Sequence, residues 1–200
     1  MKDSEKFNKN VISKEAALSA MHVGPDEFGR YSIDGEVIEI DAAMILSKIE
    51  CEYLDLSRVK RLSNEVAQYL ALCQCQLILD GLEEIDEKVA SLIIVKCHSI
   101  YLNKLRRIDR NAAKILSGFE GEAIEINGIE EIQDDAAEFL SKFSGWMTLN
   151  GLRTLSDKSA EHFANYEGYY LEMRSLDASK LSPKTVEYLM NSIHKLKLWF

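Results

Sequence analysis

The sequence predicts a right-handed α/β solenoid: about eight strand–turn–helix units of 23–24 residues, stacked in an arc with a parallel sheet on the concave side. Blocks starting at Gln76, Ala123 and Met147 share one frame, in which an apolar strand is followed by Asn or Asp and then Gly. One helix position, usually alanine, also recurs along the chain at steps of 23 to 26 residues. No such unit can bury its apolar side alone, so the repeats must stack on one another.

The strand of each unit is indicated by two apolar residues separated by one other residue. This alternation is typical of a short strand with one buried face. The pairs are Tyr31/Ile33, Leu54/Leu56, Leu77/Leu79, Ile100/Leu102, Ile124/Ile126, Met147/Leu149, Leu171/Met173 and Leu196/Leu198.

A turn with glycine follows the strand in several units. Glycine permits backbone conformations that other residues avoid, so we expect it to let the chain turn there. The glycines concerned are Gly35, Gly81, Gly128 and Gly151. We expect the polar residues beside these turns to point outward or to cap the turn; they are Asp80, Asn103, Asn127 and Asn150.

The helix of each unit is predicted from its start signal and its buried column. Serine and aspartate favour helix starts because their side-chain oxygen accepts a hydrogen bond from an unpaired helix amide. They fill six of the eight starting positions, which are Ser13, Glu39, Ser63, Asp86, Asp109, Gln133, Ser156 and Ser182. The alanine column should face the core, together with apolar residues five positions before it and three after it. Gly121, Gly145 and Gly168 are expected to cap the ends of three helices.

The units run on without a linker, which predicts one domain. Residues 1–10 are expected to be a disordered leader, and residues 11–30 a capping helix and loop, with the helix from Val11 to about Val23. Residues 31–200 form the repeats, and the last strand is the run KLKLWF. Lys195 and Lys197 are expected to guard that edge strand against pairing with another chain.

The frame resembles the leucine-rich-repeat superfamily in a short, bacterial-like variant, over about residues 31–200. It differs from the best-known consensus because Asn or Asp comes directly after the strand and is followed by Gly. The resemblance implies an arc that binds other macromolecules, and it implies no catalytic residue.

Composition and charge exclude several classes of protein. The chain carries 33 acidic and 24 basic residues, for a net charge of −9, whereas nucleic-acid binders need a basic surface. The same charge disfavours a polybasic membrane anchor. The apolar runs are too short to span a bilayer, and the first residues lack the apolar segment of a signal peptide. We therefore expect no nucleic-acid or membrane partner and a cytoplasmic location.

The outward side of the strands is the strongest candidate for a binding site. Tyrosine and tryptophan are typical interface anchors, although strands also favour aromatic residues for other reasons. Carboxylates beside them would select the charge of a protein partner. The predicted partner-binding residues are Tyr53, Asp55, Ile78, Tyr101, Glu125, Trp146, Thr148, Tyr170 and Glu172.

The cysteines and histidines offer weaker alternatives. Cys51, Cys73, Cys75 and Cys97 fall in neighbouring returns, with His98 beside the last; they could hold zinc, but their spacing favours buried free thiols. The four histidines are scattered through the frame, and no nucleophile, phosphate-binding or metalloprotease motif occurs. We expect no metal, no cofactor and no enzymatic activity.

Two functions remain open from the sequence. The first is a noncatalytic module that recognises a protein on its strand face. The second is a structural role, in which the edge strand ending at Phe200 pairs with another copy to form a homo-oligomer.

Overall fold

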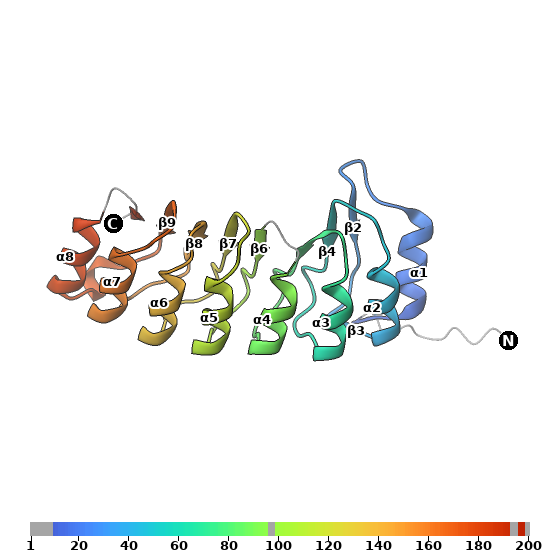
Figure 1. Cartoon of the computed structure of the whole chain (residues 1–200), viewed down its shortest axis with the longest axis horizontal. Helices are drawn as coiled ribbons and strands as arrows, with labels where there is room; N and C mark the ends of the chain where they lie inside the picture. The colour runs from blue at the N-terminus through green and yellow to red at the C-terminus, as the bar shows by residue number, and fades with distance from the viewer. Residues whose placement is uncertain (1–9, 96–98, 193–195, 199–200) are drawn as a thin grey trace.

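The computed structural model describes residues 10–95, 99–192 and 196–198 of the chain. It is an α/β fold whose main sheet has eight strands, all parallel, in the order β10-β9-β8-β7-β6-β5-β4-β2. Each strand from β4 onward therefore lies beside the next strand along the chain. The molecule is elongated in the order of its sequence, with the strands in one row and the helices in another (Figure 1).

The strands are short, and from β3 onward one α-helix separates each strand from the next. The strands are β1 (Val11–Ile12), β2 (Arg30–Ser32), β3 (Val37–Ile38), β4 (Tyr53–Asp55), β5 (Gln76–Ile78), β6 (Ser99–Tyr101), β7 (Ala123–Glu125), β8 (Trp146–Thr148), β9 (Tyr170–Met173) and β10 (Leu196–Leu198). The helices are α1 (Lys14–Val23), α2 (Ile40–Leu46), α3 (Asn64–Leu70), α4 (Glu87–Ile93), α5 (Arg110–Ser117), α6 (Asp134–Leu140), α7 (Asp157–Ala164), η1 (Ala178–Lys180) and α8 (Pro183–Asn191).

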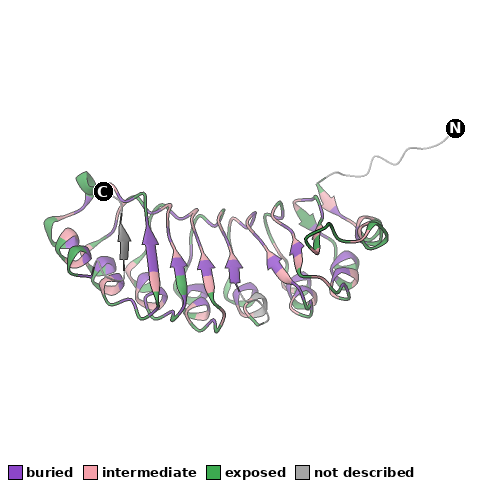
Figure 2. Cartoon of the chain, turned by 90° about the horizontal axis from the view of Figure 1, so that it is seen from above, coloured by how far each residue is buried: buried purple, intermediate pink, exposed green. Residues whose placement is uncertain are grey.

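Seen from above, the row of units bends, with the helices along the outer side of the bend and the strands inside it (Figure 2). Helices are wider than strands, so a layer of helices beside a layer of strands takes up more length along the row. The bend places the outward side of the strands on the inner part of the curve, as the sequence predicts.

The core lies between these two rows and follows the predicted columns. The alanines of the recurring helix position, from Ala17 to Ala160, are all fully buried, and Val186 packs against the same core. Apolar residues five positions earlier, such as Ile12 and Ile132, are buried too. In the strands, the middle residue faces this core: Leu54 in β4 has no exposed surface, whereas its neighbours on either side are half-buried. The small alanine side chain lets neighbouring helices pack closely.

The predicted helix starts are confirmed. The six serine and aspartate positions each accept a hydrogen bond from a backbone N–H three residues later, which satisfies one unpaired amide of the helix. Glu39 and Gln133 make no such bond. The difference follows from side-chain length, because a longer side chain does not fold back onto its own helix start as readily.

The turn glycines were expected to adopt a backbone conformation that other residues avoid, and this expectation is wrong. Among the described residues, only Gly24 and Gly29 have a positive φ. Gly128 is instead required by close approach: a Cβ atom there would lie 2.5 Å from the carbonyl oxygen of Asn103 and 2.7 Å from that of Leu105, in the preceding unit. The glycine allows the backbones of neighbouring units to touch.

The predicted helix-end glycines are also misplaced. Helices α5, α6 and α7 are capped at Gly118, Ser141 and Asn165. Gly121, Gly145 and Gly168 lie three or more residues further on, in the returns that lead to the next strand. These returns pass close to one another, because a Cβ on Gly145 would lie 2.5 Å from the carbonyl oxygen of Glu122.

The polar residues after the strands bond to one another instead of pointing outward. Asn103 donates its side-chain and backbone N–H groups to Oδ1 of Asp80 at 2.7 and 3.2 Å, and Asn127 makes the same two bonds to Asn103. The backbone N–H of Asn150 then donates to Asn127, and that of Arg174 donates to Asn150. This polar ladder ties five consecutive units together.

The ends of the chain differ from expectation in detail. The helix expected from Val11 begins at Lys14, because Val11 and Ile12 form β1, which pairs in parallel with β3. The expected disordered leader lies outside the described residues, except for Asn10. The expected last strand is present as β10, although Lys195, Trp199 and Phe200 lie outside the described residues.

Candidate functional site

All nine predicted partner-binding residues lie on one side of the main sheet, in two rows that cross the strands. The direct register between strands pairs Tyr53 with Gln76, and Trp146 with both Ala123 and Tyr170. The second row runs two residues further along each strand. It contains Asp55, Ile78, Tyr101, Glu125, Thr148 and Glu172. We call these two rows the strand face.

In the first half of the strand face, polar side chains already interact in part with neighbouring residues of the chain. Asp55 accepts a hydrogen bond from the backbone N–H of Ser57 at 3.0 Å, and its carboxylate lies 4.0 Å from Arg30. Part of its charge is therefore used within the chain. Tyr101 is half-buried, and this burial, followed by the negative charge of Glu125 in the next strand, raises the pKa of its hydroxyl. Tyr101 consequently stays a neutral hydrogen-bonding group at ordinary pH.

The second half presents an aromatic pair. The rings of Trp146 and Tyr170 lie in adjacent strands with their centroids 5.5 Å apart, a separation typical of favourable aromatic contact. Trp146 is nevertheless 57% exposed, which is unusual for so large an apolar side chain. The pair fixes the position of an exposed ring at the centre of this half of the face.

Glu172 lies behind this pair and is already occupied. Only 6% of the residue is exposed, and its carboxylate accepts hydrogen bonds from Tyr170, Asn150 and Arg174. Burial alone would raise its pKa, but the three hydrogen bonds outweigh burial and hold the pKa below its usual value. Glu172 thus holds Tyr170 and Arg174 in place from within the face.

Thr148 has an unfilled hydrogen-bonding capacity between Glu125 and Glu172. Its hydroxyl oxygen is buried and has no hydrogen-bond partner among the described residues. A buried hydroxyl without a partner is costly, so this oxygen lowers the local stability of the sheet.

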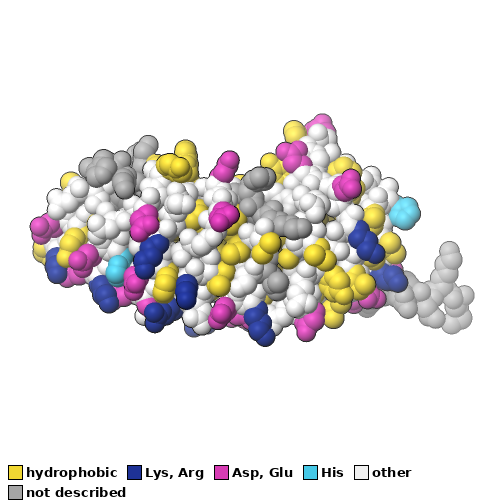
Figure 3. Space-filling view, in the orientation of Figure 1, with side chains coloured by type: hydrophobic (Ala, Val, Ile, Leu, Met, Phe, Trp, Pro, Cys, Tyr) yellow, Lys and Arg dark blue, Asp and Glu magenta, His cyan; other side chains and the backbone are white. Residues whose placement is uncertain are grey.

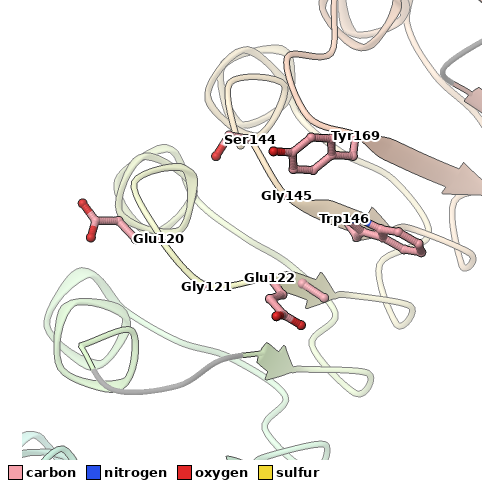
Figure 4. Close-up of a pocket in the computed structure, with 8 residues that line it drawn as sticks. Glu120, Gly121, Glu122, Ser144, Gly145, Trp146 and Tyr169 are labelled. Atoms are coloured by element: carbon pink, nitrogen blue, oxygen red, sulfur yellow. The ribbon is translucent and has the colours of Figure 1, made fainter.

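A hollow of about 600 Å³ adjoins Trp146 at the start of β8 (Figure 4). We call it the aromatic hollow. It is lined by Glu120, Gly121, Glu122, Ala123, Ser144, Gly145, Trp146 and Tyr169. The rings of Trp146 and Tyr169 lie on the same side, whereas the carboxylates of Glu120 and Glu122 point away from them at the rim.

Tyr169 was missed by the sequence reasoning. It is 81% exposed and lies one residue before β9, where it aligns with Gly145 and donates its backbone N–H to the carbonyl oxygen of that glycine at 3.1 Å. Strand alternation counts only residues inside the strand, so it passes over this position. The adjacent Tyr169–Tyr170 pair was the available signal.

The first units expose a further apolar group that the sequence did not indicate. It lies around α1 and α2, on the right-hand part of the view in Figure 3. Its members are Leu18, Met21, Val23, Phe28, Val37, Ile40 and Met44.

The cysteines differ from the prediction of free thiols. Cys51 and Cys75 form a disulfide, with their Cα atoms 5.2 Å apart, whereas Cys73 is free and buried as expected. The two bonded residues occupy neighbouring returns, which the stacking brings together. Cys97 and His98 lie outside the described residues, and elsewhere no group of three or more histidine, cysteine or acidic residues is placed to hold a metal ion.

No protein-family model matches the sequence, and comparison with the curated proteins finds no significant relative. Within the described part of the chain, no helix has the length and apolar character needed to cross a membrane.

Proposed function

We propose that the protein is a noncatalytic recognition module of the leucine-rich-repeat type, an α/β solenoid that binds a protein partner on its strand face. The observation that carries this proposal is the alignment of the predicted residues in two register rows, with Trp146 held exposed by Tyr170. Rigid aromatic side chains lose little conformational entropy when a partner covers them. The polar ladder and the close backbone contacts at glycine support the solenoid.

The residues that recur from unit to unit serve core packing, helix starts and contacts between units. What varies from unit to unit is the outer strand position, which reads Arg30, Tyr53, Gln76, Ser99, Ala123, Trp146 and Tyr170. A variable row on a regular frame is suited to recognising one particular surface. Nothing in this proposal requires a reacting group, a metal or a cofactor.

The experiment is affinity capture with a matched pair of variants. Immobilised wild-type protein should capture a partner protein. The Tyr101→Ala/Trp146→Ala variant should bind that partner with an affinity more than about a hundredfold weaker, because two anchors are removed. The control Lys158→Ala/Glu187→Ala changes two exposed helix residues and should capture as wild type does. Equal capture by all three proteins, each folded by circular dichroism, would refute the proposal.

Self-association is the second candidate, and the sheet topology favours it. β10 is the last strand of the sheet and pairs with β9 on one side only among the described residues. An open edge strand is a template for a strand of another chain. Light scattering of the full chain and of the Lys197→Pro variant tests self-association. A concentration-dependent dimer that Lys197→Pro abolishes supports this role, and a wild-type monomer at all concentrations contradicts it.

The sequence and the structure point to different compartments. The sequence favours the cytoplasm, whereas the Cys51–Cys75 disulfide favours an oxidising compartment, where such bonds persist. Alkylation of the protein at the moment of cell lysis distinguishes the two locations, because a cytoplasmic protein would carry this pair reduced.

A further inference from the structure

We propose that the aromatic hollow receives a lysine or arginine side chain from a basic, extended segment of the protein partner. This inference rests on the proposed strand-face function and names the chemistry of the partner. It concerns one position of that face, at the junction of the units that contain β7, β8 and β9.

The hollow, of about 600 Å³, has room for a long side chain together with part of the backbone that carries it. Gly121 and Gly145 supply its floor without side chains, and the return containing Gly145 packs directly on the carbonyl of Glu122, so the floor is fixed. Two exposed aromatic rings, of Trp146 and Tyr169, flank it on the same side (Figure 4). The apolar stem of a lysine or arginine can pack along such rings while its charged end stays near water.

The acids at the rim of the hollow favour a positively charged occupant. Its two acids, Glu120 and Glu122, are exposed, and no lysine or arginine of the described residues lies within ion-pair distance of either. Nearby acids are treated differently by the fold: Glu130 pairs with Arg153, and Glu138 pairs with Lys142. The charge of the hollow is therefore left for an external group.

The surrounding segment strengthens this preference. Residues 120–142 contain eight acids and one base in sequence. Such a potential attracts a basic segment before contact and repels an acidic one.

The aromatic rings add selectivity for a cation. The face of an indole ring attracts ammonium and guanidinium groups, and tryptophan is the strongest of the aromatic side chains in this respect. Trp146 is oriented by its contact with Tyr170 and not by the occupant, so the ring is in place before binding.

The test uses the fluorescence of Trp146. The chain has two tryptophans, so Trp199→Phe makes Trp146 the sole reporter. Probes are short synthetic peptides of alternating lysine and glycine, with glutamate–glycine and norleucine–glycine peptides of equal length beside them. We expect a saturable change with the lysine peptide that is about tenfold weaker in affinity after Glu120→Gln/Glu122→Gln.

A matched variant separates the hollow from the overall charge. Glu65→Gln/Glu87→Gln removes the same charge from two exposed helix residues and should weaken binding of the lysine peptide less than about twofold. Tyr169→Ala should weaken it roughly as much as the change at Glu120 and Glu122, about tenfold. Equal weakening by both glutamate pairs, or no saturable change with the lysine peptide, would overturn the proposal.

Failure of the proposed occupant of the hollow and failure of the strand-face function give different results. If the norleucine or glutamate peptide binds at Trp146 and the lysine peptide does not, the face binds ligands but the occupant is wrong. If the Tyr101→Ala/Trp146→Ala protein retains full partner capture, the strand face itself is wrong, whatever the peptides show.

Discussion

The side-chain amide of Asn127 donates a hydrogen bond to Oδ1 of Asn103 over 2.7 Å, and the two asparagines occupy the same place in neighbouring units. The backbone N–H of Asn127 donates to the same oxygen, and Oδ1 of Asn127 accepts in turn from Asn150. One side chain therefore serves two interfaces. The stability of the row depends on such contacts, because each unit touches only its neighbours.

Asn127→Ala should lower the free energy of unfolding by about 1–3 kcal/mol, because it leaves the half-buried backbone N–H of Asn150 without its acceptor. Urea denaturation measures this loss. Asn191→Ala, at the exposed end of α8, serves as the control and should change stability by less than about 0.5 kcal/mol. Equal effects of the two substitutions would show that the polar ladder does not stabilise the protein.

Gly128→Ala should destabilise the protein by about 1–3 kcal/mol, because the new Cβ would overlap the backbone of Asn103 and Leu105. Gly118→Ala is the matched control: its Cβ would meet only the carbonyl oxygen of Ile115, at 3.5 Å, and its φ of −88° suits any residue. It should be neutral or stabilising by a few tenths of a kcal/mol. Thermal unfolding of both variants would contradict the close-packing explanation if they lost stability equally.

Acid should remove the stability that the protein gains from the ionised carboxylate of Glu172. Its pKa in the folded protein lies below the ordinary value of 4.5, so the folded state favours its ionised form. This stability is fully present above pH 4.5 and is lost as the pH falls through the lower folded pKa. Glu172→Gln should therefore lose stability relative to wild type at neutral pH, and the gap should narrow in acid. Exposed Glu167→Gln is the control; a gap that does not change with pH would show that the carboxylate is not held ionised.

Reduction should destabilise the protein through Cys51 and Cys75. Their bond closes a loop with a sequence separation of 24 residues, for which chain entropy predicts a contribution of about 3 kcal/mol. The melting temperature should fall in reductant, and it should not respond to reductant in Cys51→Ala/Cys75→Ala. Cys73→Ala, which removes only the buried free thiol, should keep the sensitivity. An unresponsive wild-type melt would mean that the bond does not form in solution.

The parts of the fold that the sequence predicts well are those that each unit determines for itself. Helix starts such as Ser156 depend on a side chain and an amide three residues away, and the buried alanine column depends on helix periodicity. Both are local patterns, repeated many times, so each copy supports the others. The fold class and the placement of Trp146 on the strand face follow from these patterns.

The features that the sequence did not predict are those made between units. The bonds of Asn103 and Asn127, the crowding at Gly128 and the disulfide of Cys51 all join residues more than twenty positions apart. A single-unit frame does not contain these distances. Tyr169 was overlooked for a related reason, since it faces the hollow from a return and not from a strand.

Site-specific photo-crosslinking tests the central claim most directly. A benzophenone amino acid is placed at Gln76, Ile78 or Ala123, which lie in the two rows of the strand face beside the proposed anchors, and at Lys158 or Glu187 on the helix side, as exposed controls. We expect one partner protein to be crosslinked from the three strand-face positions and from neither helix position. Crosslinking of the same partner from the helix positions, with none from the strand face, would contradict the proposed function.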